Sequence, residues 1–232
     1  MTVHSQIAVE CAHQNSAAFD KQGQHSTPGC PVSAARGKTL ACCVGRRSNI
    51  SKLDCGASQA VKYEDVALRL LSSDPAERVT LQHVLEGAPG YAQRVTGAPP
   101  GAAHAQSTFT ALPAGKTYAD KFLFGIFAGN EMVGCIDLIR GYPTANAATL
   151  GLLLVAEQHQ GMGIGRRAYA LLERFASRWG NCDVIRLGVV MTNAEVLGFW
   201  RKLGFSETGE TKPYNHGSVC SQTIIMEKPL QT

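Results

Sequence analysis

The stretch Gln160-Gly161-Met162-Gly163-Ile164-Gly165 stands between two segments of different periodicity. Before it, residues 149–155 are almost all apolar, which is typical of a strand buried on both faces. After it, residues 163–179 carry apolar side chains at helical spacing. A glycine-rich turn from strand to helix presents free backbone N–H groups at the positive end of the helix dipole, which predicts an anion site. Arg166 and Arg167 add positive charge, so a diphosphate is the natural ligand.

Two common kinds of diphosphate loop do not match this stretch. A nucleoside triphosphate loop ends in Gly-Lys-Ser/Thr, whereas Gly165 is followed by Arg166. A dinucleotide fingerprint that starts at Gly161 needs its third glycine at position 166, which is an arginine. The acidic residue expected after the next strand is also missing, because Asp183 precedes that strand. A nucleotide- or NAD-binding enzyme is therefore disfavoured.

Gln160-x-x-Gly163-x-Gly165 resembles the acetyl-CoA signature of the GNAT superfamily of N-acetyltransferases, Arg/Gln-x-x-Gly-x-Gly/Ala. Residues 193–205, Asn-Ala-Glu-Val-Leu-Gly-Phe-Trp-Arg-Lys-Leu-Gly-Phe, look like the second signature of the family. The resemblance covers about residues 63–230 in element order and is sharp over about 150–206. It implies a mixed α/β fold with a mostly antiparallel central sheet, a splayed strand pair and flanking helices.

The order of the segments agrees with that fold. We expect strands at residues 66–71, 121–128, 131–140, 149–155, 184–190, 205–209 and 223–228, and helices after Pro75, at 163–179 and at 194–203. Gly129-Asn130 predicts a hairpin, and 87–106 should be a loop with one short helix. Residues 1–60 show no periodicity and one aromatic side chain, so we expect a disordered extension before an acetyltransferase domain at 61–232.

The resemblance also assigns roles to individual residues. Backbone groups of Leu153 and Val155 would pair with the pantetheine arm where their strand splays from its neighbour at a bulge. The N–H groups that follow Gln160 would hold the pyrophosphate, and Asn193 would contact the arm or a bridging water. The cofactor-binding residues implied in this way are Leu153, Val155, Gln160, Gly161, Met162, Gly163, Ile164, Gly165, Arg166 and Asn193. The co-substrate is acetyl-CoA, with no metal.

Acetyl transfer to an amine needs a base and an oxyanion donor, with an optional acid for the thiolate. The backbone N–H of Val155 is the expected oxyanion donor. The family often places an acidic Tyr seven residues after the Asn, but that position is Trp200, so Tyr214 is the candidate acid or else a wall of the substrate pocket. Asp137, within an apolar stretch, is either the base or a structural carboxylate. His159 is interpreted as a surface residue.

The composition of the chain limits the classes of partner that we expect it to bind. The net charge of +4 comes mostly from the first sixty residues, which argues against a nucleic-acid-binding face. Apolar runs are too short to cross a membrane, and no secretory signal is visible, so we expect a cytoplasmic protein. The eight cysteines lack zinc-site spacing.

The acceptor is the least determined part of the prediction. Its pocket is expected from residues 81–106, 142–146 and 211–221, which include Tyr91, Tyr142, Lys212 and His216. No acidic cluster appears there, which favours a small or amino-acid-like primary amine over a polycation. Two alternatives stay open: a weakly active or inactive CoA-binding module that regulates a partner, and assembly into a homodimer.

Overall fold

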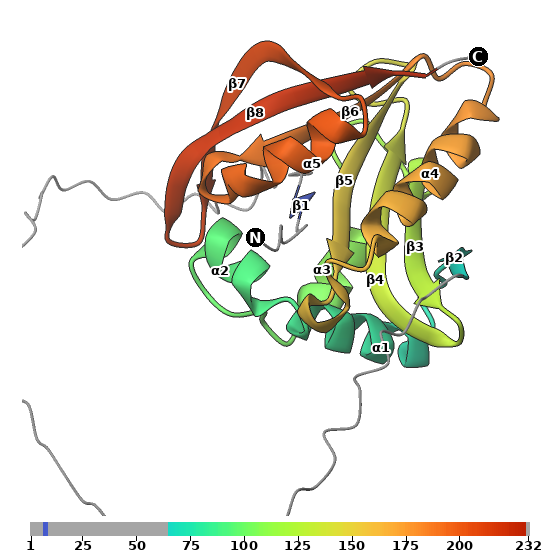
Figure 1. Cartoon of the computed structure of the whole chain (residues 1–232), viewed down its shortest axis with the longest axis vertical. Coiled ribbons are helices and arrows are strands. Elements are labelled where there is room, and N and C mark those ends of the chain that lie inside the picture. The colour runs from blue at the N-terminus through green and yellow to red at the C-terminus, as the bar shows by residue number, and fades with distance from the viewer. Residues whose placement is uncertain (1–6, 9–64, 231–232) are drawn as a thin grey trace, which may run out of the picture. The chain divides into compact units, whose positions relative to one another are not determined.

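The computed structural model describes residues 7–8 and 65–230, and these form one mixed sheet with flanking helices (Figure 1). The strands are β1 (Ile7–Ala8), β2 (Val66–Leu70), β3 (Lys121–Ala128), β4 (Glu131–Arg140), β5 (Ala147–Val155), β6 (Val184–Val190), β7 (Ser206–His216) and β8 (Val219–Pro229). Their order is β2-β3-β4-β5-β6-β8-β7, and β1 pairs with β5 outside this path. Every pairing is antiparallel except β5 with β6, so the predicted fold class is confirmed. Apart from residues 7–8, the expected extension at 1–60 lies outside the described residues.

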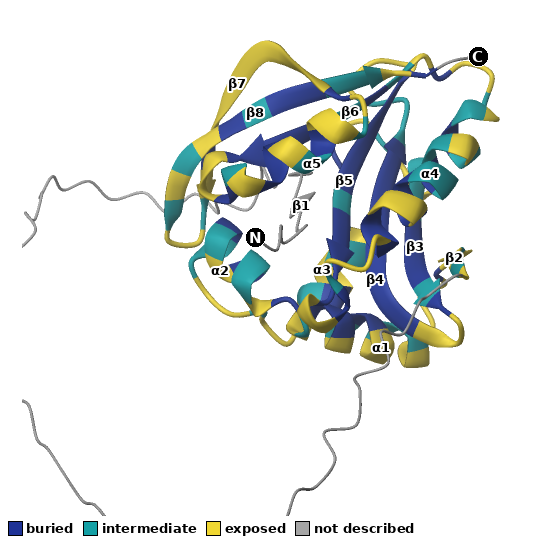
Figure 2. Ribbon diagram, in the orientation of Figure 1, coloured by how far each residue is buried: buried dark blue, intermediate teal, exposed yellow. Residues whose placement is uncertain are grey.

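The helices cover both faces of this sheet. They are α1 (Pro75–Glu86), α2 (Pro89–Thr96), α3 (His104–Thr110), α4 (Ile164–Ser177) and α5 (Leu197–Lys202), with 3₁₀ turns η1 (Tyr118–Asp120), η2 (Glu157–His159) and η3 (Met191–Val196). On one face, α4 buries Ala168, Leu172 and Ala176, which recur every four residues and therefore form one stripe. The other face packs against α1 through Leu81 and Leu85. Figure 2 shows β3, β4 and β5 buried between these two layers.

The sheet opens between its two parallel strands. β5 pairs with β6 only over residues 147–149, after which β6 continues beside β8 alone. On its other side, β5 has a bulge, because Leu150 pairs with Leu138 and Leu152 pairs with Asp137, which leaves Gly151 as the extra residue. The end of β5 therefore has an open edge toward β6. On this edge β1 pairs with Leu152 and Leu153.

Two segments differ from the sequence prediction. The segment 87–106 holds all of α2 and the start of α3, because Pro89 takes the first helical position, where its missing N–H costs nothing. The last two strands are longer than predicted, so Tyr214 lies on β7 rather than in a loop. Polar side chains on the exposed face of β7 hid its length. Among the described residues, no helix combines the length and apolar character needed to span a bilayer.

Candidate active site

The glycine turn adopts a conformation that side-chain-bearing residues rarely take. Gly161 and Gly163 both have a φ of 77°, in the left-handed region, and Gly163 caps the N-terminus of α4. The turn is exposed, and a Cβ atom added to Gly163 would meet nothing within 4 Å. The first-turn N–H groups of α4 thus face an accessible space, as an anion site requires.

A cavity of about 170 Å³ lies against this turn. Val155 lines it from the end of β5, and Phe199 and Lys202 line it from α5. Arg166 adds a second cation from the first turn of α4. The structure therefore joins the glycine turn to the open end of β5, with positive charge on both sides.

The open edge of β5 presents the backbone of alternate residues. The N–H of Ala156 donates to the carbonyl oxygen of Val133 at 2.9 Å, so even-numbered residues at this end bond toward β4. Because backbone groups alternate in direction along a strand, those of Leu153 and Val155 face the gap toward β6. The carbonyl of Val155 accepts a hydrogen bond from Nε2 of Gln160 at 2.7 Å, which ties the glycine turn to the strand. The N–H of Val155 faces the same gap.

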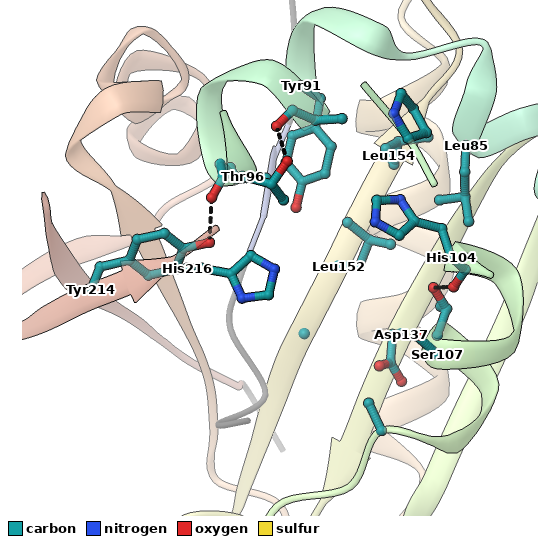
Figure 3. Close-up of a pocket in the computed structure, with 16 residues that line it drawn as sticks. Leu85, Tyr91, Thr96, His104, Ser107, Asp137, Leu152, Leu154, Tyr214 and His216 are labelled. Atoms are coloured by element: carbon teal, nitrogen blue, oxygen red, sulfur yellow. Dashed lines mark hydrogen bonds between the residues drawn. The ribbon is translucent and has the colours of Figure 1, made fainter. Parts of the chain in front are cut away.

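A second cavity, of about 180 Å³, lies on the opposite face of β5 (Figure 3). Its lining comes from elements far apart in the sequence: Tyr91 of α2, His104 of α3, Asp137 of β4, Leu152 and Leu154 of β5, and Tyr214 and His216 of β7. Aliphatic side chains make up much of its wall. Burial, together with the neighbouring His216, lowers the pKa of His104 below its usual 6.5 and so favours its uncharged form. A cavity of this size with little positive charge suits a small molecule.

Asp137 is the acidic side chain among the described residues that line this cavity. Its Oδ2 accepts a hydrogen bond from Nζ of Lys121 at 2.6 Å, whereas its buried Oδ1 has no protein partner. Desolvation raises the pKa of Asp137 above its usual 3.8, and the charge of Lys121 and its hydrogen bond oppose that rise. A buried carboxylate oxygen without a partner is costly unless a ligand group meets it.

The hydroxyl of Tyr214 is engaged in a hydrogen bond to a backbone carbonyl. Its hydroxyl donates to the carbonyl oxygen of Val95 at 2.8 Å, and the ring is buried beside the cavity. This arrangement joins β7 to α2 and favours the wall interpretation of Tyr214 over the acid. Tyr91 is half-buried, and desolvation raises the pKa of its phenol.

Two residues of the second signature, Asn193 and Trp200, make structural contacts. Oδ1 of the buried Asn193 accepts a hydrogen bond from Nε of Arg94 at 2.7 Å, so η3 is tied to α2. Asn193 does not line the cavity at the glycine turn. Trp200 is fully buried and packs edge-on against Tyr169 and Phe205, which makes it a core residue.

Several residues differ from their predicted places. The interpretation of His159 as a surface residue was wrong, because its ring is buried and Nε2 lies 3.3 Å from Oε1 of Glu131. Tyr142 and Lys212 do not line the acceptor cavity. The loop at 142–146 precedes β5 and so lies at the opposite end of that strand from Leu154.

The sequence analysis did not single out several residues that lie at the two cavities or contact their lining. Phe199 and Lys202 stand within the second signature, and their place two turns from Asn193 on a short helix was an available signal. His104 lies in the range expected for the acceptor pocket but was not named there, and only the fold brings Lys121 to Asp137. Among the residues with assigned positions, no group of three His, Cys, Asp or Glu is placed to hold a metal ion.

Comparison with known proteins agrees with this geometry. Residues 96–205 match the family described as the acetyltransferase (GNAT) family. The chain has no match among the sequences of curated proteins. An acetyltransferase from Thermus thermophilus has a similar structure, with 27% identity, a TM-score of 0.56, and coverage of 71% of this chain and 97% of that one.

Two less similar structures share the fold. The ribosomal-protein-S18-alanine N-acetyltransferase from Escherichia coli is 18% identical, with a TM-score of 0.53 and coverage of 72% of this chain and 96% of that one. An acetyltransferase from Salmonella typhimurium that modifies the N-terminal serine of ribosomal protein L7/L12 is also 18% identical, with a TM-score of 0.56 and coverage of 72% and 95%. The glycine turn and the splayed strands thus lie within the segment, residues 96–205, that matches the acetyltransferase (GNAT) family, and the two less similar structures support the fold alone.

Proposed function

We propose that this domain transfers the acetyl group of acetyl-CoA to the primary amine of a small acceptor. The observation that carries the proposal is that two cavities lie on opposite faces of β5, at the end of the strand that follows its bulge. Val155 lines the cavity at the glycine turn, and its neighbour Leu154 lines the other. A donor held on one face and an acceptor held on the other would bring their reacting groups together in the gap.

The donor side is built mainly from backbone groups. N–H groups of residues 161–166 would hold the pyrophosphate, with Arg166 and Lys202 adding charge. Leu153 and Val155 would pair with the pantetheine amides as an added strand, and at Leu153 the arm would take the place of β1, which pairs with this edge. Asn193, which also accepts a hydrogen bond from Arg94, stays a prediction as a further contact with the cofactor arm.

On the acceptor side, Asp137 would act as the base. Oδ1 takes a proton from the acceptor ammonium, and the free amine then attacks the thioester carbon. The N–H of Val155 donates to the oxygen that becomes negative. The carbon–sulfur bond breaks, the carbonyl re-forms, and the departing thiolate takes up the second proton, which the nitrogen loses as the amide forms. No enzyme acid is used, because the Tyr214 hydroxyl donates to the carbonyl oxygen of Val95 and Trp200 lies in the core.

The cavity favours an acceptor with one positive charge. Asp137 is already paired with Lys121, so a second cationic group would find no acidic partner among the described lining residues. The aliphatic wall around Leu85 and Val95 suits an apolar body of about amino-acid size. Monoamines and amino-acid-like amines therefore rank above polyamines and aminoglycosides.

The test measures thiol release from acetyl-CoA with an amine panel, and mass spectrometry identifies the acetylated product. The panel contains alkyl and aryl monoamines, amino acid amides, diamines, an aminoglycoside and short peptides with Ser or Ala N-termini. The peptides are included because two structurally similar enzymes act on ribosomal proteins. Thermal shifts with acetyl-CoA and with CoA measure binding separately.

We expect a thermal shift with acetyl-CoA and thiol release with a monoamine. Acetyl-CoA binding without turnover by any amine would instead support the regulatory CoA-binding module. The absence of any shift with acetyl-CoA or CoA would overturn both functions.

A further inference from the structure

Asp137, which lines the acceptor cavity, belongs to a buried ion pair. Nζ of Lys121 lies 2.6 Å from Oδ2 of Asp137, and the two side chains are only 4% and 7% exposed. Lys121 begins β3, and Asp137 lies on β4 next to the bulge at Gly151. Water therefore has little access to either charge, and each depends on the other for compensation.

The two carboxylate oxygens of Asp137 have different surroundings. Oδ2 is taken by Lys121, whereas Oδ1 is buried without a partner in a residue that lines the cavity. Gly151 leaves room for this orientation, because a Cβ atom there would lie 3.3 Å from Oδ2 and press on the pair. The orientation of the carboxylate thus depends on one cation and one missing side chain.

We propose that Lys121 is a positioning residue for acetyl transfer: it holds Oδ2 of Asp137, so that Oδ1 faces the acceptor amine as an ionised proton acceptor. This inference rests on the proposed function, because it assigns Lys121 a role through the base of that reaction. A carboxylate buried here without a cation would favour its neutral form, which cannot accept a proton. The ammonium of Lys121 favours the charged form without entering the reaction itself.

The groups around Asp137 leave this role to Lys121. Cys135 lies on the same strand, and burial together with the charge of Asp137 raises the pKa of its thiol, so it stays neutral. Around the cavity, α2 contributes Tyr91, α3 contributes His104, and β7 contributes Tyr214 and His216, whereas β5 contributes Gly151 and apolar side chains. Among the residues the structure places, Lys121 is the cation within ion-pair distance of Asp137.

The test compares pH profiles of kcat/KM for the full chain and for Lys121→Met, Lys121→Gln and Lys121→Arg, with the amine that gives the highest turnover. We expect the acid limb of Lys121→Met and Lys121→Gln to move to higher pH by about one unit or more, with about a tenfold loss of kcat/KM near pH 7. Lys121→Arg should recover most of that loss because it keeps the charge. The Kd for acetyl-CoA should stay within about twofold and shows that each variant is folded.

A double-mutant cycle separates this role from a purely structural one. If Lys121 acts through Asp137, Lys121→Met should have almost no further effect on kcat/KM in an Asp137→Asn background. An equal loss in both backgrounds, or an acid limb that does not move, overturns the proposal. If both neutral variants fail to fold, the ¹³Cγ shift of Asp137 in the unmodified chain decides, because a carboxyl still protonated at the pH optimum contradicts the proposal.

Failure of the proposed function would give a different result from failure of the positioning role. In that case the unmodified chain releases no thiol with any amine, and no pH profile exists to compare. Turnover by the unmodified chain with an unchanged profile in the Lys121 variants overturns only the positioning role.

Discussion

The glycine turn and the acceptor cavity lie on opposite faces of β5 and are built from different kinds of groups. The turn uses backbone N–H groups of consecutive residues, held by positive φ angles at Gly161 and Gly163. The cavity uses side chains from α1, α2, α3, β4, β5 and β7, separated by up to 131 positions between Leu85 and His216. The donor end is thus a local structure, whereas the acceptor end exists only once the chain has folded.

Because of this difference, we expect substitutions at the acceptor cavity to lower turnover and substitutions at the glycine turn to lower the affinity for acetyl-CoA. The largest effect is expected at Asp137. Asp137→Asn keeps the shape of the side chain but removes the proton acceptor, so kcat should fall by about 100-fold or more. Calorimetry should show the affinity for acetyl-CoA nearly unchanged, and near-normal turnover would mean that Asp137 is a structural carboxylate.

At the turn, the expected effect is on binding. Gly163→Val forces a β-branched residue into the left-handed region at a cost of about 1–2 kcal/mol, and the turn should relax away from the conformation that presents its N–H groups. The affinity for acetyl-CoA should fall by about tenfold, as measured by calorimetry.

Gly180→Val is the matched control. Gly180 also has a positive φ, and a Cβ atom there would also meet nothing within 4 Å, but it follows the far end of α4. Both variants should lose similar stability, and only Gly163→Val should lose affinity. Equal losses of affinity would show that the turn is not the binding site.

The cations at the turn should contribute less than its backbone. Arg166→Ala combined with Lys202→Ala should weaken acetyl-CoA binding by a few-fold at low salt, because both side chains are exposed. The difference should shrink as salt is added. Arg174→Ala with Arg178→Ala removes the same charge from the other end of α4 and should leave affinity unchanged, and an equal effect would indicate a long-range charge effect only.

The smallest expected effect is on the pH dependence of the free energy of unfolding, through Asp137 in the acceptor cavity. Because the folded state raises the pKa of Asp137 above its usual 3.8, the unfolded chain releases this proton first as pH rises. That carboxyl therefore lowers the free energy of unfolding progressively as pH rises from about 4 toward its folded pKa. Urea unfolding of Asp137→Asn should lack this decline, so over this pH range the free energy of unfolding of the unmodified chain should fall relative to that of the variant. Parallel pH curves for the two proteins would contradict the raised pKa.

The sequence by itself determined the features that depend on neighbours along the chain. The switch from a buried strand to an amphipathic helix at Gln160–Gly165 predicted the turn, and the hairpin at Gly129-Asn130 predicted β3 and β4 with the bounds that the structure shows. These patterns could be interpreted because strand and helix periods, and the need for glycine at positive φ, are local properties.

Only the tertiary structure decided the features that join distant segments. The pairing of Lys121 with Asp137, the bond from Tyr214 to Val95 and the burial of His159 each depend on which elements become neighbours. Side-chain spacing along the chain carries no record of such contacts, because register, bulges and helix packing set them after the sheet forms. The glycine turn could therefore be predicted from six consecutive residues, whereas the acceptor cavity appeared only when β4, β5 and β7 were brought together around it.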